Sequence, residues 1–276
     1  MSSEFFPPGI HPSATIESGA IIGENVSIGA YSYIGPGVTI RDNVQISRSV
    51  VIGGKTTIGE NTQIYPLNVL GTPGQDLKYP DFSEGTLVIG KNNIIREKCS
   101  IHAGTPAHGT VIGDKNFIMS ETHIGHDCII GNHIIIASVG LSGHVEVEDH
   151  VVLGAKSGFH QFCRIGQFAM VSGVSAITKD VPPFALSEHE RPNEFSGINV
   201  IGLKRRGFKK EDLQTIRKIY DTLYSMKGAI ANRIEPLRQE FGENPFGKII
   251  IEFLEKSKRN VCTPPRSHKQ TEEESG

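Results

Sequence analysis

The 276-residue chain contains no tryptophan, only four cysteines and no long uninterrupted apolar run. A membrane-spanning helix needs about 20 consecutive apolar residues, and a secretion signal needs an apolar stretch near the N-terminus. The cysteines have neither the spacing of a metal site nor that of a disulfide framework. With a formal net charge of −2, the chain also lacks the basic excess of nucleic-acid-binding proteins. We therefore expect a cytoplasmic protein without cofactor, metal, nucleic-acid partner or stable membrane insertion.

An aliphatic residue at every sixth position dominates most of the chain. The series contains 26 hexads and runs through residues 10–70, 89–101, 112–136 and 141–177. This period is too long for the face of one helix or strand, whereas two inward positions per six residues describe a short flat strand and a turn. The pattern predicts a parallel β-helix, in which each rung buries its aliphatic residue by stacking on the next. Three hexads per triangular turn give about nine coils.

Three of the cysteines fall on the second inward position of the repeat. Cys99, Cys128 and Cys163 each lie four residues after a repeat aliphatic, and Cys262 lies in the C-terminal tail. We expect the first three to be small core residues.

Three irregularities interrupt the hexad series. Two insertions, residues 71–86 and 102–110, carry Gly, Pro and polar residues. A solenoid extrudes such insertions as loops, which often build its binding face. The third irregularity is the five-residue step from Ile136 to Leu141, so one rung lacks a residue.

Histidines recur on one side of the predicted coil. Three hexads return the chain to the same face, which stacks the apolar repeat residues Ile101, Ile124, Leu141 and Phe159. These are followed by four histidines that occupy no inward position, namely His102, His126, His144 and His160, with His123 at the preceding corner. With strands about 4.8 Å apart, the column would span roughly 15 Å. A flat face cannot enclose a ligand alone, so we expect a cleft with a neighbouring subunit, in a cyclic trimer.

The period changes beyond Pro182 and Pro183. Apolar residues then recur at three and four positions, which predicts amphipathic helices over about 213–224, 230–241 and 246–257. We therefore divide the chain into a β-helix domain (1–183), a helical domain (184–262) and a polar, unpatterned, disordered tail (263–276).

Seven short motifs, in order, resemble one family of enzymes. They are QDLKY at 75–79, IH at 101–102, HIGHDC at 123–128, GHV at 143–145, HQFC at 160–163, DVPP at 180–183 and GLKRRGF at 202–208. Over about residues 8–260 the chain is similar to the UDP-N-acetylglucosamine O-acyltransferases of lipid A biosynthesis. The resemblance implies a mainly β fold, a left-handed parallel β-helix followed by a small C-terminal helical module, and a homotrimer.

The resemblance also implies a reaction. The family moves an (R)-3-hydroxyacyl group from acyl carrier protein to the glucosamine 3-hydroxyl of a UDP-sugar. Such a transfer needs a base for the hydroxyl proton and a donor for the oxyanion. His126 matches the base, Asp127 the residue that orients it, and Gly143 the backbone N–H that faces the thioester oxygen. Successive strand side chains point to opposite faces, so direct pairing of His126 with Asp127 requires a corner conformation.

Further residues match substrate contacts of the family. Those matching the acceptor site and its loop are Gln75, Asp76, Lys78, His102, His123, His144, His160 and Gln161. Those matching nucleotide and phosphate contacts are Asn199, Arg205 and Arg206, since arginine holds phosphate oxygens bidentately. The basic cluster from Lys204 to Lys210 would attract the acidic carrier protein. Gly173 matches the position that limits the acyl chain, and a glycine there predicts a long donor.

The chain departs from the family pattern at several positions. Ile201 and Ala103 stand where a glutamate and an arginine are usual, and one rung is a residue short. An acceptor with an amine at sugar carbon 3 therefore remains open. The sequence is also compatible with a coenzyme-A-dependent hexapeptide acetyltransferase, with an intersubunit zinc site using His123, His126 and His144 as in γ-class carbonic anhydrases, and with a non-catalytic scaffold.

Overall fold

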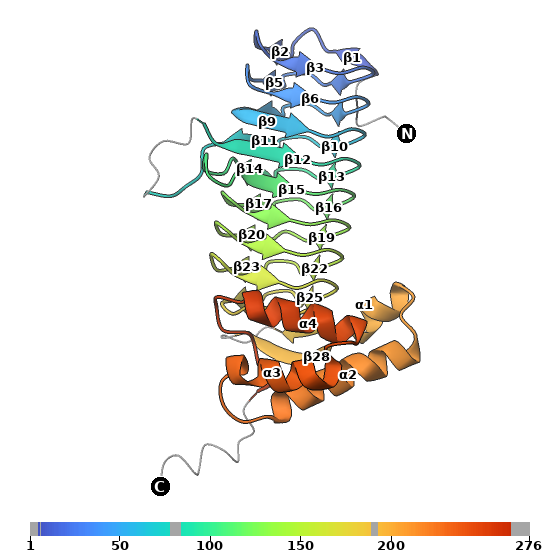
Figure 1. Ribbon diagram of the computed structural model, residues 1–276. Helices are drawn as coiled ribbons and strands as arrows, with labels where there is room; N and C mark the ends of the chain where they lie inside the picture. Colours follow the sequence, from blue (N-terminus) through green and yellow to red (C-terminus); the bar gives the residue numbers. More distant parts are fainter. Residues whose placement is uncertain (1–4, 6, 78–83, 189–192, 266–276) are drawn as a thin grey trace.

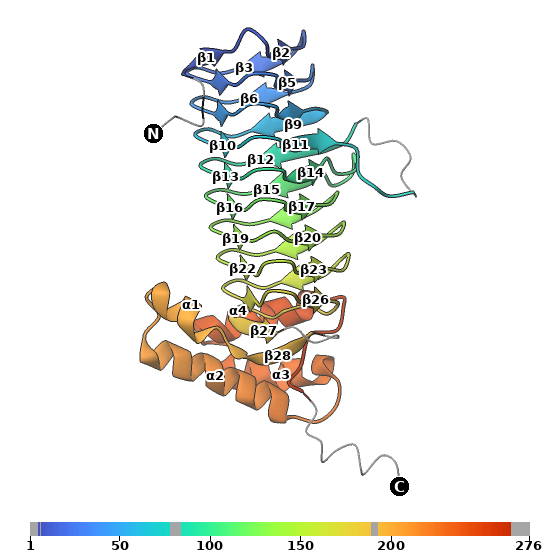
Figure 2. The same cartoon turned by 180° about the vertical axis from the view of Figure 1, so that it is seen from behind.

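The computed structural model describes residues 5, 7–77, 84–188 and 193–265. Lys78 and residues 266–276, most of the tail expected to be disordered, lie outside the described residues. The chain forms a long coil with a group of helices at its C-terminal end (Figures 1 and 2). No helix in the described part of the chain is long and apolar enough to cross a bilayer.

The coil has three sheets, and each receives every third strand of the chain. The first contains β1 (Gly9–Ile10), β4 (Ser27–Ile28), β7 (Gln45–Ile46), β10 (Gln63–Ile64), β13 (Ile94–Ile95), β16 (Phe117–Ile118), β19 (Ile135–Ile136), β22 (Val152–Leu153) and β25 (Met170–Val171). The second contains β2 (Thr15–Ile16), β5 (Tyr33–Ile34), β8 (Val51–Ile52), β11 (Val69–Thr72), β14 (Ser100–His102), β17 (His123–Ile124), β20 (Gly140–Leu141), β23 (Gly158–Phe159) and β26 (Ala176–Ile177). The third contains β3 (Ile21–Ile22), β6 (Thr39–Ile40), β9 (Lys55–Ile58), β12 (Thr86–Ile89), β15 (Thr110–Ile112), β18 (Ile129–Ile130), β21 (Glu146–Val147) and β24 (Arg164–Ile165).

The register follows the hexad count residue by residue. Ile101 pairs with Ile124, Ile124 with Leu141 and Leu141 with Phe159, all in parallel strands. These side chains are buried in one continuous core that runs along the coil. Cys99, Cys128 and Cys163 are also buried there, as predicted.

The corners of the coil depend on a left-handed backbone residue. Non-glycine residues with φ near +60° recur three positions after the repeat aliphatic; Asn61, Asp127 and His144 are examples, with φ of 56°, 58° and 59°. Such a conformation is unfavourable for an L-residue in isolation and persists because the packed rungs on either side fix it. In the shortened rung this residue is Ser138, only two positions after Ile136. The missing residue is thus absorbed at a corner, without disturbing the pairing of β20.

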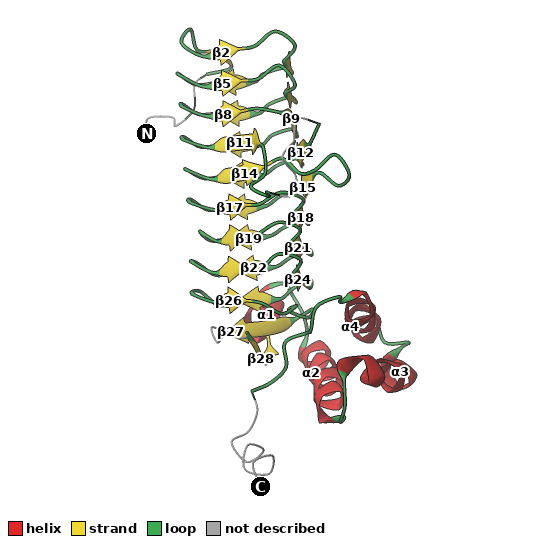
Figure 3. Cartoon of the chain, turned by 90° about the vertical axis from the view of Figure 1, so that its left-hand side faces the viewer, coloured by secondary structure: helices red, strands yellow, loops and turns green. Residues whose placement is uncertain are grey.

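The C-terminal part confirms the three predicted helices and adds unpredicted elements. α2 (Lys210–Ser225), α3 (Ile230–Phe241) and α4 (Pro245–Lys256) pack together beside the last coils (Figure 3). Unpredicted are β27 (Ala185–Glu188), which extends the first sheet in parallel, its antiparallel partner β28 (Glu194–Ile198), and α1 (Val200–Arg205). Cys262, the last residue of the predicted helical domain, is buried, and its N–H donates to the Asp180 carbonyl at 2.9 Å.

Candidate active site

His126 and Asp127 form a hydrogen-bonded pair at the corner between β17 and β18. His126 Nδ1 lies 2.7 Å from Asp127 Oδ2, and both side chains are buried. The left-handed conformation of Asp127 turns the backbone, so that two successive side chains reach the same side. The corner conformation required for direct pairing is therefore present. A carboxylate on Nδ1 fixes the Nδ1–H tautomer and leaves Nε2 as the proton acceptor.

The second insertion holds Asp127 in place. The Thr105 N–H and hydroxyl both donate to Asp127 Oδ1, at 2.7 and 2.8 Å. The Asp127 N–H in turn donates to Thr110 Oγ1 at 2.9 Å. Burial alone would raise the pKa of Asp127, but the hydrogen bonds from His126 and Thr105 outweigh it and hold that pKa below its usual value. Asp127 is therefore ionised at neutral pH.

A polar hollow of about 460 Å³ opens in front of this pair. Its lining residues are Gln75, Asp76, His102, His123, Gly125, His126, Gly140, Leu141, Ser142, Gly143 and Gln161. Asp76 Oδ2 lies 4.0 Å from His126 Nε2. A Cβ on Gly143 would lie only 2.5 Å from that same nitrogen, so glycine is what leaves room beside it. Among the described residues the Gly143 N–H donates to no acceptor.

Three further histidines surround the pair in neutral form. His102 is buried, its Nδ1 has no partner among the described residues, and burial, with His123 and His126 adding to it, lowers its pKa to about 4. Its ring meets that of His123 edge-on at 4.8 Å, and burial lowers the pKa of His123 as well. His144 stacks on Phe162 at 4.5 Å, and burial lowers its pKa although Asp127 acts in the opposite direction. The site therefore offers uncharged imidazoles to a ligand.

Comparisons with known proteins identify the family. A model for domain 2 of UDP N-acetylglucosamine O-acyltransferase matches residues 180–262, and a bacterial transferase hexapeptide model matches residues 7–42 and 109–143. An Aliivibrio fischeri protein named acyl-acyl-carrier-protein–UDP-N-acetylglucosamine O-acyltransferase is 44% identical over 91% of this chain and 97% of its own length. A protein of the same name from Sinorhizobium fredii is 38% identical over 94% and 97%. The solved structure of LpxA from Acinetobacter baumannii has a TM-score of 0.87 and 40% identity, covering 92% of this chain and 99% of that one.

The chain belongs to the UDP-N-acetylglucosamine O-acyltransferase family. It is an acyltransferase, and its coil is the left-handed β-helix of hexapeptide repeats. The fold and family inferred from the motifs are thereby confirmed. The site residues themselves are located by the structure alone.

Not every predicted site residue lies at the hollow. Gln75, Asp76, His102, His123, His126, Gly143 and Gln161 do, whereas Asp127 and His144 contact His126 but do not line the hollow. His160 is exposed, and its Nδ1 lies 3.1 Å from the Gln161 carbonyl. The expectation that the histidines are not core residues holds for the coil interior, but His102 and His126 are 4% and 6% exposed, far more enclosed than residues of an open face.

The residues expected to hold the nucleotide lie at a different corner of the same chain. Arg206 Nη1 lies 2.8 Å from His150 Nδ1, at the corner between the third and first sheets, and Arg205 is exposed. The Asn199 side chain accepts from Gly202 N and donates to the Phe168 carbonyl, so it caps α1. Gly173 lies at yet another corner, between β25 and β26. Within one chain these residues do not join the hollow.

Several residues at the site were not predicted from the sequence. Thr105 and Thr110 bind Asp127, Phe162 stacks on His144, and Ser142 lines the hollow. Two of these could have been predicted from the repeat. Counting three hexads places Phe162 one coil beyond His144, and Ser142 directly precedes Gly143. Thr105 lies in an insertion, where the repeat gives no signal.

The geometry at the pair argues against a zinc site. Ligand atoms of His126, Asp127 and His144 lie within 4.8 Å of one another. Two ligands on a tetrahedral zinc with bonds of about 2.0–2.1 Å are about 3.3 Å apart. The 2.7 Å between His126 Nδ1 and Asp127 Oδ2 is instead a hydrogen-bond distance, and Asp127 Oδ1 already accepts twice from Thr105. These contacts favour a hydrogen-bonded base over a metal centre.

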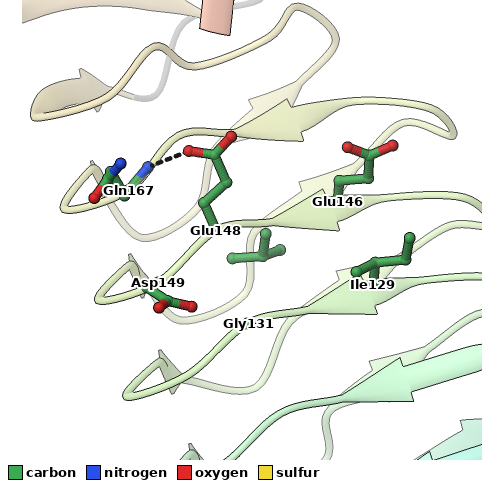
Figure 4. A pocket seen from close by; sticks show the side chains of 7 residues that line it. Ile129, Gly131, Glu146, Glu148, Asp149 and Gln167 are labelled. Carbon is green, nitrogen blue, oxygen red and sulfur yellow. Dashed lines mark hydrogen bonds between the residues drawn. The ribbon is translucent and has the colours of Figure 1, made fainter. Parts of the chain in front are cut away.

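A second hollow, of about 310 Å³, lies on the third sheet (Figure 4). Its acidic residues are Glu146, Glu148 and Asp149. Glu148 accepts from Gln167 N and pairs with Arg164, and burial raises its pKa. These carboxylates are engaged in contacts within the coil, and no histidine lines this hollow among the described residues. The His126 corner is therefore the stronger candidate for an active site.

Proposed function

We propose that the protein transfers an (R)-3-hydroxyacyl group from acyl carrier protein to the glucosamine 3-hydroxyl of UDP-N-acetylglucosamine, the first step of lipid A biosynthesis. The proposal is supported by family membership and by relatives named for this reaction. The observation that carries it is the buried His126–Asp127 pair, with Nε2 facing a polar hollow beside a Gly143 N–H that has no acceptor among the described residues.

The chemistry follows from these three residues. His126 Nε2 removes the proton of the acceptor hydroxyl as that oxygen attacks the thioester carbon, and Asp127 stabilises the resulting imidazolium. The Gly143 N–H donates to the oxyanion. The carbon–sulfur bond then breaks, and the imidazolium returns its proton to the leaving thiolate. An ester and the free thiol of the carrier result, so no further reactant is needed.

The hollow suits a hydroxylated acceptor. Neutral His102 and His123 can donate or accept hydrogen bonds without burying charge, and Gln75 and Gln161 add amide groups. Asp76 lies opposite His126 and can accept from a sugar hydroxyl. A 3-amino acceptor would use the same contacts, so the acceptor is assigned from the relatives' names.

We also propose that the working enzyme is a trimer with active sites shared between chains. Arg206 and His126 occupy different corners of one coil, so a single ligand that contacts both must lie between two chains. The second sheet also exposes apolar side chains at Tyr33, Val51 and Val69, which a neighbour would cover.

Product analysis tests the reaction. The protein is incubated with UDP-N-acetylglucosamine and 3-hydroxyacyl carrier proteins of several chain lengths, or with acetyl-CoA, and products are read by mass spectrometry. We expect a 3-O-acylated sugar from the carrier-bound donors alone, with longer chains preferred because Gly173, at the position that limits the acyl chain in the family, has no side chain. Acetylation from coenzyme A would support the competing acetyltransferase.

Subunit mixing tests the shared site. His126→Ala and Arg206→Glu are each expected to be inactive as pure proteins. In mixed trimers of random composition, about a quarter of the sites would combine an intact His126 with an intact Arg206 from different chains. Recovered activity near that fraction supports shared sites. Mixtures as inactive as their components would place both residues in a site of one chain.

A further inference from the structure

The second insertion is a closed loop that presents Thr105 to Asp127. A Cβ on Gly104 would lie 2.3 Å from the Gly109 carbonyl carbon, so the two ends of the loop touch. Inside it, the N–H groups of His108 and Gly109 donate to the Thr105 carbonyl at 3.2 and 2.9 Å. Thr105 itself is 4% exposed. Its hydroxyl is therefore held at a fixed place, and it is not a mobile surface group.

This loop also anchors the first insertion. The Ala103 N–H donates to the Thr72 carbonyl at 2.8 Å, and the Gly104 N–H to the Thr86 carbonyl at 3.0 Å. Thr72 is the last residue of β11 and Thr86 the first residue of β12, so these two residues mark the two ends of the first insertion (Figure 1). That insertion carries Asp76 to within 4.0 Å of His126 Nε2. Both insertions thus form one unit around the base.

Asp127 receives donors on both oxygens. Thr105 donates twice to Oδ1, and His126 donates to Oδ2. An ionised carboxylate is only an acceptor, so each donor stabilises its charge and fixes its plane. The oxygen that faces His126 is thereby aimed at Nδ1. Among the described residues, the Thr105 hydroxyl is the one side-chain donor to Asp127 Oδ1, the oxygen that faces away from His126.

We propose that Thr105 is a positioning residue for the transfer reaction: through Asp127 it holds the His126 imidazole in the orientation and tautomer in which Nε2 is unprotonated and can take the acceptor proton. The inference rests on the proposed role of His126 as general base. Among the described residues, the charged and titratable groups that face His126 are Asp127, Asp76, His144, His102 and His123. Thr105 bonds only the first of them, so its effect reaches His126 through Asp127.

Thr105→Val and Thr105→Ser separate positioning from packing. Valine keeps the shape and the backbone donor but removes the hydroxyl. We expect it to lower kcat about tenfold, with KM for both substrates within about twofold. It should also move the acidic limb of the pH profile to higher pH, since a carboxylate with one donor fewer favours protonated His126. Serine should restore the wild-type values. A valine variant with unchanged kcat and pH profile, or with only KM changed, would overturn the proposal.

A second measurement does not need activity. Diethyl pyrocarbonate acylates neutral imidazole, and peptide mass spectrometry gives the rate at His126 as a function of pH, with exposed His160 as internal reference. In Thr105→Val we expect the midpoint at His126 to move to higher pH and that at His160 to stay. If this shift occurs in a protein that acylates no UDP-sugar, the proposed function fails and the role of Thr105 stands. If Thr105→Val is active, and if both the His126 modification midpoint and the acidic limb of the pH profile stay unchanged, the positioning role of Thr105 is rejected and the proposed function stands.

Discussion

Two corners of the same coil use the same backbone for opposite purposes. Between the third and first sheets, side chains of successive coils saturate the N–H two residues after the repeat aliphatic. Lys91 N donates to Asp114 Oδ1, Asp114 N to Asn132 Oδ1, and Asn132 N to Asp149 Oδ1, at 2.9, 2.7 and 2.7 Å. At the corner between the second and third sheets, the equivalent N–H of Gly143 has no acceptor among the described residues.

The difference shows how a repeat becomes a catalyst. Both corners have the left-handed residue that turns the chain, so the scaffold does not distinguish them. An Asp/Asn ladder satisfies the polar backbone at one corner and gives these N–H groups a structural role, although Arg206 lies at the same corner. At the other, the ladder is replaced by imidazoles, a carboxylate and a glycine, which leaves a donor and a base directed at the same space. Four predictions test this contrast, from the largest effect to the smallest.

The base should dominate the catalytic corner. His126→Ala removes a side chain that lies outside the coil interior, so the fold should persist while kcat falls about a thousandfold. Steady-state kinetics with carrier-bound donor, together with circular dichroism and molecular mass, measure both quantities. His11→Ala, at the exposed N-terminal coil, is the control and should keep full activity. Turnover within a few fold of wild type would remove His126 from the mechanism.

Gly143 should be nearly as sensitive, for a steric reason. An alanine Cβ there would lie 2.5 Å from His126 Nε2, so the imidazole must move. A displacement of about 1 Å at a reacting group costs on the order of a hundredfold, which is the loss of kcat we expect for Gly143→Ala. Gly53→Ala is the matched control, because a Cβ there has no neighbour within 4 Å. Equal activity of the two variants would contradict the assignment of Gly143.

The coil was predictable because one rule governs it. Each apolar repeat residue stacks on the repeat residue three hexads further along the chain. Counting hexads therefore placed Ile124 on Ile101 and Leu141 on Ile124. The His126–Asp127 pair was predictable from its motif, provided that the backbone turns a corner there. Residues inside insertions escape the rule, and Thr105 was therefore not predicted. α1, β27 and β28 were not predicted either, because these short elements depend on contacts with the last coil and show no hydrophobic periodicity.

Neutral histidines at the catalytic corner should make folding stability depend on pH. The pKa of His102 is about 4 in the fold and about 6.5 in an unfolded chain. The unfolded chain therefore binds more protons between these values, and stability falls as the pH is lowered through this window. From pH 7 to pH 5 this one group should cost about 2 kcal/mol. Urea unfolding at pH 7 and pH 5 measures this change. The free energy of unfolding should fall less between the two pH values in His102→Gln than in wild type. Equal losses in the two proteins would refute the assigned burial effect.

Substitutions in the Asp/Asn ladder should lower the free energy of unfolding and leave kcat unchanged. Asn132→Ala removes the oxygen that accepts from Asp114 N and the amide that donates to Asp149. A partly buried N–H left without its partner costs about 1 kcal/mol, so the free energy of unfolding should fall by about that amount. Asn132→Asp keeps the acceptor oxygen and should recover part of the loss. Because neither variant touches the hollow, kcat should stay at the wild-type value in both. A fall in kcat with unchanged stability would show that the two corners are coupled, and the division between a structural and a catalytic edge would not hold.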